Sequence, residues 1–284
     1  MKTVVITGAS SGIGRVTAKR LAHQGWQVFA GVRKQADADT LNADHDNIIA
    51  LHLDVADPAT IAASVETVGA ALDGAKLSGL INNAGIAFMG PLALQPMSEI
   101  EAHFRVNILG AIACTQGFAP LLGMDRARTG PPGRIVNISS AGGLIAAPFV
   151  GAYTATKHAL EGATDTFRRE LMIYGIDAIV VGPGAVKTPI WDKADKQNEA
   201  GPYKDTEWAE AMEAYSDTLM KAGEQGYEPE KIAKVIETAL TDPSPKARYA
   251  PVPSKLTNFT IARRLPKRWL DGIFASRLGL KRRN

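Results

Sequence analysis

The chain has 284 residues, of which 45% are hydrophobic and 21% are charged, and its formal net charge is +3. This composition is typical of a globular protein that can bury a sizeable core, in one large α/β domain or two small ones. The small net charge argues against nucleic acid as a partner of the whole protein.

A single cysteine, Cys114, excludes an internal disulfide bond and suits a reducing cytoplasm, where we expect the protein to be located. The favoured role of this thiol is that of a small buried apolar group. Only a short apolar run follows Lys2, so no signal peptide is expected. No apolar segment is expected to approach the ~20 residues of a membrane-spanning helix. The five histidines show no metal-ligand spacing, and no metal is predicted.

An apolar run at residues 4–6 predicts a buried parallel strand, which leads into a glycine-rich turn at 7–14 and then a helix. Gly8, Gly12 and Gly14 would let the backbone turn tightly and approach a phosphate, while the helix offers its N-terminal amides. Strand, turn and helix in this order predict a dinucleotide site, whereas isolated glycines would indicate an ordinary loop.

The second and third strands are predicted at 27–32 and 48–55. The second leads into Arg33 and Lys34, at the place where dinucleotide folds use a carboxylate to bond the ribose 2′-hydroxyl. Two cations without a carboxylate favour a 2′-phosphate, and the alternative is a solvated basic turn. Asp54, near the end of the third strand, could contact the adenine edge.

Four further strands complete a predicted sheet of about seven: 77–81, 134–140, 176–181 and one near 247–250. Polar residues and glycines follow the first three of these strands, and the carboxyl ends of parallel strands are where open α/β sheets bind ligands. Asn107, on a helix amid apolar neighbours, is either a core hydrogen-bonding residue or part of a site. The predicted fold class is α/β, a doubly wound parallel sheet with helices on both faces.

Tyr153 and Lys157 are four residues apart on a predicted helix and therefore share a face, with Ser140 thirteen residues upstream of the tyrosine. A nearby ammonium stabilises a phenolate and moves it towards acid–base chemistry at neutral pH. A surface pair is the commoner origin of this spacing. The glycine turn and the polar strand ends favour the catalytic alternative.

Two segments lie outside this regular pattern. Residues 189–226 mix aromatic and charged side chains irregularly, which favours a substrate lid within a catalytic domain at 1–250. Residues 251–284 form a basic amphipathic extension, and 263–284 alone carry a net charge of +7. We expect this extension to pack on its own domain and border the substrate entrance, with a possible peripheral membrane contact.

Taken together, the motifs resemble those of the short-chain dehydrogenase/reductase superfamily, in its order and at its spacing, over roughly residues 1–250. They are Thr7-Gly8-x3-Gly12-x-Gly14, Asn82-Asn83-Ala84-Gly85, Asn107, Ser140, Tyr153-x3-Lys157 and Pro183-Gly184-x-Val186-x-Thr188. The resemblance implies a single Rossmann-type domain and an NAD(P)-dependent interconversion of an alcohol and a carbonyl. It also implies a homodimer or homotetramer.

The resemblance assigns roles residue by residue. Tyr153 would be the general acid–base, Lys157 would lower its pKa and hold the nicotinamide ribose, and Ser140 would bind the substrate oxygen. Asn107 would anchor a water of the proton relay. The remaining cofactor-binding positions are Gly8, Ser10, Ser11, Gly12, Ile13, Gly14, Arg33, Asp54, Val55, Asn83, Ala84, Gly85, Pro183, Gly184, Val186 and Thr188. Arg33 without a preceding acid implies that NADP is preferred over NAD.

The aromatics of 189–226 and the apolar tail favour a bulky hydrophobic substrate, such as a steroid-, retinoid- or aromatic-like alcohol or ketone. The segments 28–34 and 248–266 are similar to those of relatives that act on such compounds. One alternative is a reductase of polar oxo compounds, such as oxoacyl thioesters or sugars. The other is a non-catalytic nucleotide-binding regulator, although such proteins often lose the tyrosine or the lysine.

Overall fold

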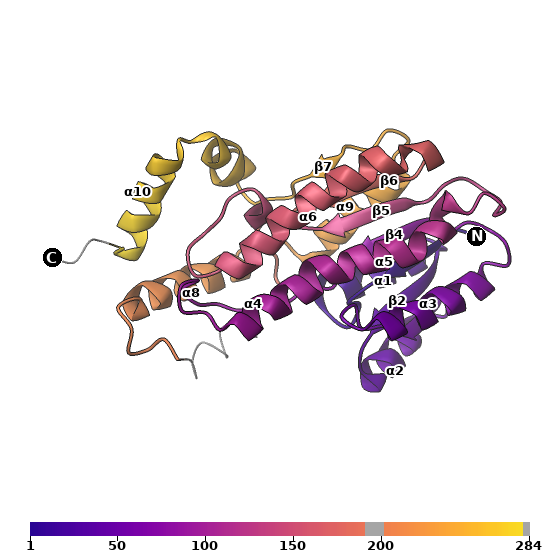
Figure 1. Ribbon diagram of the computed structural model, residues 1–284, viewed down its shortest axis with the longest axis horizontal. Helices are drawn as coiled ribbons and strands as arrows, with labels where there is room; N and C mark the ends of the chain where they lie inside the picture. The colour runs from indigo at the N-terminus through magenta and orange to yellow at the C-terminus, as the bar shows by residue number, and fades with distance from the viewer. Residues whose placement is uncertain (191–201, 281–284) are drawn as a thin grey trace.

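A computed structural model describes residues 1–190 and 202–280 of the chain (Figure 1). Its centre is a seven-stranded, fully parallel sheet in the order β3-β2-β1-β4-β5-β6-β7. The strands are β1 (Thr3–Ile6), β2 (Gln27–Val32), β3 (Ile48–His52), β4 (Gly79–Asn82), β5 (Arg134–Ile138), β6 (Asp177–Val181) and β7 (Arg248–Tyr249). The predicted fold class, a single doubly wound α/β domain, is confirmed.

Helices cover both faces of the sheet because consecutive strand residues point to opposite sides. Val4 and Ile6 of β1 belong to a core with α1 (Gly12–His23), α2 (Gln35–Asp44) and α9 (Pro229–Thr241). Val5, between them, belongs to a second core with α3 (Pro58–Ala71) and α5 (Gly110–Ala119). The long α6 (Gly151–Glu170) also packs on β6.

Several predicted strands are shorter in the structure than the apolar runs that suggested them. β3 ends at His52 because its partner β2 ends at Val32, the residue that pairs with His52. β4 begins at Gly79 instead of Leu77, whose amide donates to the carbonyl oxygen of Leu121 outside the sheet. Hydrophobic runs therefore overstate strand length where the neighbouring strand stops.

One long helical run corrects the expectation about apolar segments. Residues 97–124 join α4 (Met97–Phe104), η1 (Arg105–Leu109), α5 and η2 (Pro120–Met124) over 28 residues, long and apolar enough to cross a membrane by length and composition. An 18-residue window has mean hydropathy 1.4, and 61% of it is buried inside the fold. Cys114 lies there, fully buried, and burial raises the pKa of its thiol to about 12. This run is a core helix, which apolar composition also produces.

The segment predicted to be the least regular contains a helix of 16 residues, α8 (Ala209–Glu224). Its apolar side chains join Tyr203 and Phe149 in a small cluster of their own. Among the four aromatic residues of 189–226, Trp191 lies outside the described residues. The expectation of irregular structure was therefore wrong for 209–224, where amphipathic packing produces a regular helix, and the role of the segment as a substrate lid stays a prediction.

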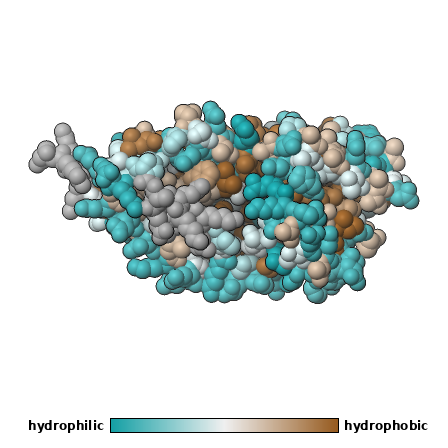
Figure 2. Space-filling model, turned by 90° about the horizontal axis from the view of Figure 1, so that it is seen from below, coloured by the Kyte–Doolittle hydropathy of each residue, from teal (hydrophilic) through white to brown (hydrophobic). Residues whose placement is uncertain are grey.

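The C-terminal extension continues through η5 (Leu256–Ile261) and η6 (Ala262–Arg264) to α10 (Lys267–Leu278). Figure 1 shows α10 apart from the sheet, with its end beside α8. Phe274 and Leu278 pack into the α8 cluster, whereas Trp269 is 68% exposed. The surface is mainly hydrophilic in the view of Figure 2, with hydrophobic areas near the middle of that face. The extension thus packs on its own domain, as predicted.

Candidate active site

A cavity of about 360 Å³ lies at the carboxyl ends of the strands. It brings together all the predicted site residues except two, Gly14 and Asn107, which do not line it. The lining residues that were predicted are Gly8, Ser10, Ser11, Gly12, Ile13, Arg33, Asp54, Val55, Asn83, Ala84, Gly85, Ser140, Tyr153, Lys157, Pro183, Gly184, Val186 and Thr188.

The glycine turn has a backbone that other residues would strain. Gly8 has φ +65° and Gly12 has φ +53°, both in the left-handed region. A Cβ added at Gly8 would lie 2.7 Å from the Cα of Ala84, and one at Gly14 would collide with the carbonyl oxygen of Gly8. Gly14 therefore serves close packing of helix against turn, while Gly8 and Gly12 shape the cavity wall.

Thr7 and Asn83 hold the glycine turn against the end of β4. The Thr7 hydroxyl accepts from the amides of Asn83 and Ala84, each at 3.0 Å. The Asn83 side-chain amide donates to the carbonyl oxygens of Thr7 and Gly8 at 3.0 and 2.9 Å. Asn83 lines the cavity, but its amide hydrogens are thus engaged in shaping the turn.

Tyr153 and Ser140 meet inside the cavity. The Ser140 hydroxyl accepts from the amide of Gly142 at 3.0 Å, which leaves its proton for a hydrogen bond with the Tyr153 phenol. Burial raises the pKa of Tyr153 above its usual value, and the bond from Ser140 lowers it in part. The serine donates to the phenol oxygen, and this bond favours the phenolate, which brings Tyr153 closer to acid–base chemistry with a substrate oxygen.

Lys157 lies one helical turn after Tyr153, with its Nζ 5.6 Å from the centre of the tyrosine ring. The side chain is 4% exposed, and Nζ donates to the carbonyl oxygen of Ile138 at 2.8 Å. Burial lowers the pKa of Lys157 to about 8, while the charge of Glu161 raises it. A buried cation so near a phenol stabilises the phenolate when the tyrosine gives up its proton.

Asn107 is 1% exposed and lies behind the cavity in η1, a π-helical turn. Its Oδ1 accepts from the amide of Ile86 at 2.8 Å, and its Nδ2 donates to the Ile86 carbonyl oxygen and the Thr156 hydroxyl. Asn107 is therefore a core hydrogen-bonding residue, and the segment that it fixes at Ile86 lines the cavity. Its role in the proton relay stays a prediction. A π-helical turn inside a longer helix is frequent at functional sites.

His103 holds the same cavity segment from one turn earlier, a contact that the sequence did not reveal. Its Nε2 accepts from the amide of Phe88 at 2.9 Å, so its Nδ1 carries the proton and donates to the Glu99 carbonyl oxygen. Burial lowers the pKa of His103, which favours this neutral form. The histidine is structural, as expected, but it positions the cavity wall.

The cavity also has lining residues that sequence reasoning missed. Most are apolar and lie one or two positions from a predicted residue, so the signal was proximity to a motif at a strand end. They are Gly31, Val32, Leu53, Ile86, Ala87, Phe88, Val106, Ile138, Ser139, Pro189 and Ile190.

These features fit a nicotinamide dinucleotide. The glycine turn and the first amides of α1 offer a phosphate cradle. The Arg33 guanidinium is exposed at the rim, and within 1–190 and 202–280 no ion pair engages it. Asp54 also lines the cavity, and one of its carboxylate oxygens accepts from the amide of Ala56.

Comparison with known proteins agrees with this geometry. The short chain dehydrogenase family matches residues 2–199. An NADPH-dependent 3-dehydrocapnine reductase of Ornithobacterium rhinotracheale is 34% identical over 275 residues, 96% of each chain. Retinol dehydrogenase 5 of Mus musculus is 31% identical over 95% of this chain and 86% of its own.

Among solved structures, a short chain dehydrogenase/reductase of Burkholderia phymatum in complex with NAD superposes with a TM-score of 0.77. It is 26% identical, and the match covers 92% of both chains. Family, fold and site geometry thus agree. The chain belongs to the short-chain dehydrogenase/reductase superfamily, whose members interconvert alcohols and carbonyls with NAD(P).

Proposed function

We propose that this oxidoreductase prefers NADPH and acts on a bulky apolar alcohol or ketone. The observation that carries the substrate class is an apolar cluster around Tyr153, which contains Ala87, Met89 and Val150. Ile190, Tyr215 and Leu219 pack against this cluster, and Ala87 and Ile190 also line the cavity. A substrate whose oxygen reaches Tyr153 would place its carbon skeleton against this apolar part of the wall.

In this proposal, the residues of the site divide the work around the reacting oxygen. Tyr153 gives its proton to the substrate oxygen during reduction, and Ser140 holds that oxygen and the phenol in place. Lys157 stabilises the resulting phenolate, and Asn107 keeps the segment around Ile86 in position. The nicotinamide, when bound, supplies the hydride. Orientation and charge stabilisation by the chain lower the barrier.

The apolar substrate class has further support in the names of relatives. A retinol dehydrogenase acts on a large apolar alcohol, and its similarity extends over 95% of this chain. A reductase of polar oxo compounds is the alternative within the same family. A ketone with an apolar carbon skeleton would gain binding energy by burying that skeleton against the cluster. A polar compound would lose hydrogen bonds to water there, which weakens its binding.

A substrate panel tests this proposal. We expect higher kcat/KM for steroid-, retinoid- and aryl-type ketones than for sugars or oxoacyl thioesters. Ile190→Asn, which places an amide in the apolar wall, should lower kcat/KM for the apolar ketones about tenfold. Leu256→Asn, a matched change at a residue that is 66% exposed, should leave it unchanged. Faster turnover of the polar compounds, or no effect of Ile190→Asn, would contradict the proposal.

The cofactor preference depends on Arg33. Arg33→Ala should weaken NADPH binding roughly tenfold, since it removes a charge-assisted hydrogen bond that is partly screened by solvent. NADH binding should not change, because NADH has no 2′-phosphate. Fluorescence titration of both cofactors measures this. Arg264→Ala, which removes the same charge from the C-terminal extension, is the control, and equal affinities in the unmodified protein would refute the preference.

Three further expectations stay predictions. A homodimer or homotetramer is checked by light scattering of the purified protein. Cytoplasmic location is checked by fractionation of the source cells. Contact of α10 with a membrane is checked by co-sedimentation with anionic and neutral vesicles, where binding to neither would remove that role from the extension.

A further inference from the structure

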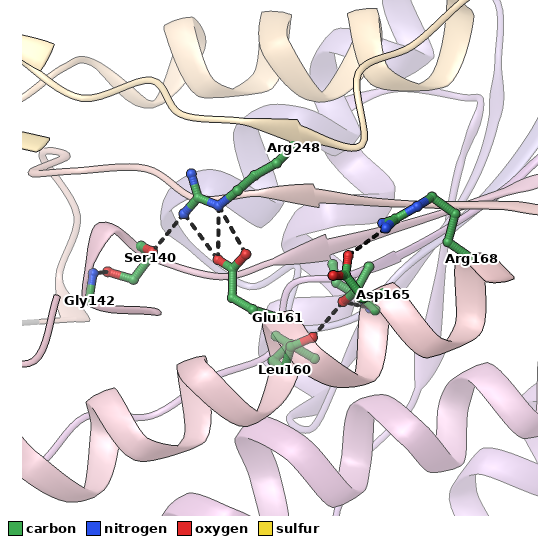
Figure 3. Close-up of polar contacts among 9 residues, drawn as sticks. Ser140, Gly142, Leu160, Glu161, Asp165, Arg168 and Arg248 are labelled. Atoms are coloured by element: carbon green, nitrogen blue, oxygen red, sulfur yellow. Dashed lines mark hydrogen bonds and ion pairs between the residues drawn. The ribbon is translucent and has the colours of Figure 1, made fainter. Parts of the chain in front are cut away.

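Arg248, on the edge strand β7, reaches the active-site serine from outside the cavity. Its Nη2 donates to the main-chain carbonyl oxygen of Ser140 at 3.2 Å. The same guanidinium forms a bidentate pair with Glu161 of α6, with Nε 2.9 Å from Oε2 and Nη2 3.0 Å from Oε1 (Figure 3). One side chain thus ties together the end of β5, the helix of Tyr153 and the edge of the sheet.

This arginine is held on several sides. The Arg248 and Glu161 side chains are 19% and 13% exposed, so solvent screens their attraction weakly. A Cβ at Gly182 would collide with Nη2, so the backbone of that residue leaves just enough room for the guanidinium. The guanidinium carbon lies 5.1 Å from the ring of Phe259, which is 3% exposed. Phe259 belongs to η5, so the C-terminal extension also contacts the Arg248 guanidinium.

The two residues that Arg248 binds, Ser140 and Glu161, each act on another group of the site. Ser140 carries the hydroxyl that bonds the Tyr153 phenol. Glu161 follows Lys157 by one helical turn, and its charge favours the lysine ammonium. The residues that line the cavity include none of 251–280, although Val252 and Pro253 pack beside the lining residue Gly184. The expectation that the extension borders the substrate entrance stays a prediction. The extension also contacts the arginine that holds the serine.

We propose that Arg248 is a positioning residue, which fixes the Ser140 main chain and the Glu161 carboxylate and is itself braced by Phe259. This inference rests on the proposed roles of Ser140, Tyr153 and Lys157. Displacement of the serine by a fraction of an ångström would misplace its hydroxyl relative to the phenol. Loss of the guanidinium would also leave Glu161 as an unpaired negative charge close to Lys157.

Arg248→Met tests the inference. We expect kcat to fall about 10- to 100-fold, because misplacement of catalytic groups by ~1 Å costs up to that factor. NADPH affinity, measured by fluorescence titration, should change little. Arg168→Met is the matched control, since it breaks an ion pair with Asp165 farther along the same helix (Figure 3). The control should keep kcat unchanged.

The pH profile separates positioning from general stabilisation. Among the described residues, the charge of Glu161 on α6 acts on Lys157, and Tyr215 on α8 interacts electrostatically with Tyr153. Arg248 on β7 forms the ion pair with Glu161. Arg248→Met leaves the Glu161 charge unpaired and should move the apparent pKa of kcat upwards. Glu161→Gln removes that charge and should move it downwards. Shifts of opposite sign are not expected from a pair that only stabilises the fold.

A lower melting temperature with unchanged kcat and unchanged pH profile would overturn the inference. If Arg248→Met does not fold, Phe259→Leu removes the aromatic brace and leaves the ion pair intact, and it should lower kcat in the same direction. Unchanged kcat in folded Phe259→Leu would then overturn it. Tyr153→Phe distinguishes failure of the proposed function from failure of the inference about Arg248. If that variant stays active, the proposed function fails, whereas an inactive Tyr153→Phe beside a fully active Arg248→Met refutes the inference alone.

Discussion

Replacement of Tyr153 by phenylalanine is expected to lower kcat by about 10²- to 10⁴-fold, the usual contribution of a positioned general acid or base. The change removes one hydroxyl and almost no volume from a residue that is 7% exposed. Cofactor binding should therefore persist, because the glycine turn and Lys157 remain in place. Steady-state rates together with NADPH titration measure both quantities on the same preparation.

Tyr174→Phe is the control for this experiment. Tyr174 ends the helical segment that follows α6, in η4 (Leu171–Tyr174), and is packed against the core away from the cavity. Its loss of a hydroxyl should leave kcat unchanged. Near wild-type turnover in Tyr153→Phe would remove the tyrosine from its catalytic role.

Most of the residues that the sequence predicted for the site line one cavity, because they lie in short motifs at the ends of strands. Such motifs constrain local backbone, as the positive φ of Gly8 and Gly12 shows. A parallel sheet then brings the ends of β1, β4, β5 and β6 to one edge without further information. The spacing of Ser140, Tyr153 and Lys157 needs only one strand and the helix that follows it.

The pair of Glu161 and Arg248 could not be predicted in the same way. These residues are 87 positions apart, and they meet because β7 pairs with β6 in a register that sets Arg248 beside Val180. Edge-strand register depends on the packing of the segments on either side of it. Glu161 alone carried a signal, since it follows Lys157 by one helical turn.

The sequence placed Asn107 on a helix but did not show that the helical run extends over 97–124, where 61% of an apolar 18-residue window is buried. A second helix, at 209–224, was missed. The second has charged residues on its outer face and a narrow apolar stripe through Met212, Tyr215 and Leu219, a helical spacing that the abundance of charges obscured. The spacing of apolar residues along a segment therefore predicts its secondary structure better than its overall composition does.

Replacement of Lys157 by methionine is expected to remove turnover, to weaken NADPH binding and yet to stabilise the protein without cofactor. The side chain is 4% exposed, and burial lowers the pKa of the ammonium from 10.5 to about 8. A shift of this size corresponds to roughly 3 kcal/mol by which the folded state disfavours the charged form. Methionine keeps most of the volume without the charge.

The gain is reduced because the bond from Nζ to the Ile138 carbonyl oxygen is lost, which costs about 1 kcal/mol. A net increase of about 2 kcal/mol in the free energy of unfolding remains below pH 8. As the pH rises from about 8 to about 10.5, folded wild-type protein releases the Lys157 proton while unfolded protein keeps it, so wild-type stability rises. The advantage of the variant should shrink over that window.

Denaturant unfolding of the cofactor-free proteins, between about pH 6 and pH 10.5, measures this dependence. Lys234→Met, on the exposed side of α9, is the control and should show no such change across the window. A Lys157→Met variant that is less stable than wild type at pH 7, or whose difference does not vary with pH, would contradict the burial of a charged lysine. A stabilised but inactive variant would mean that Lys157 is retained for catalysis at a cost in folding free energy, as active-site residues often are.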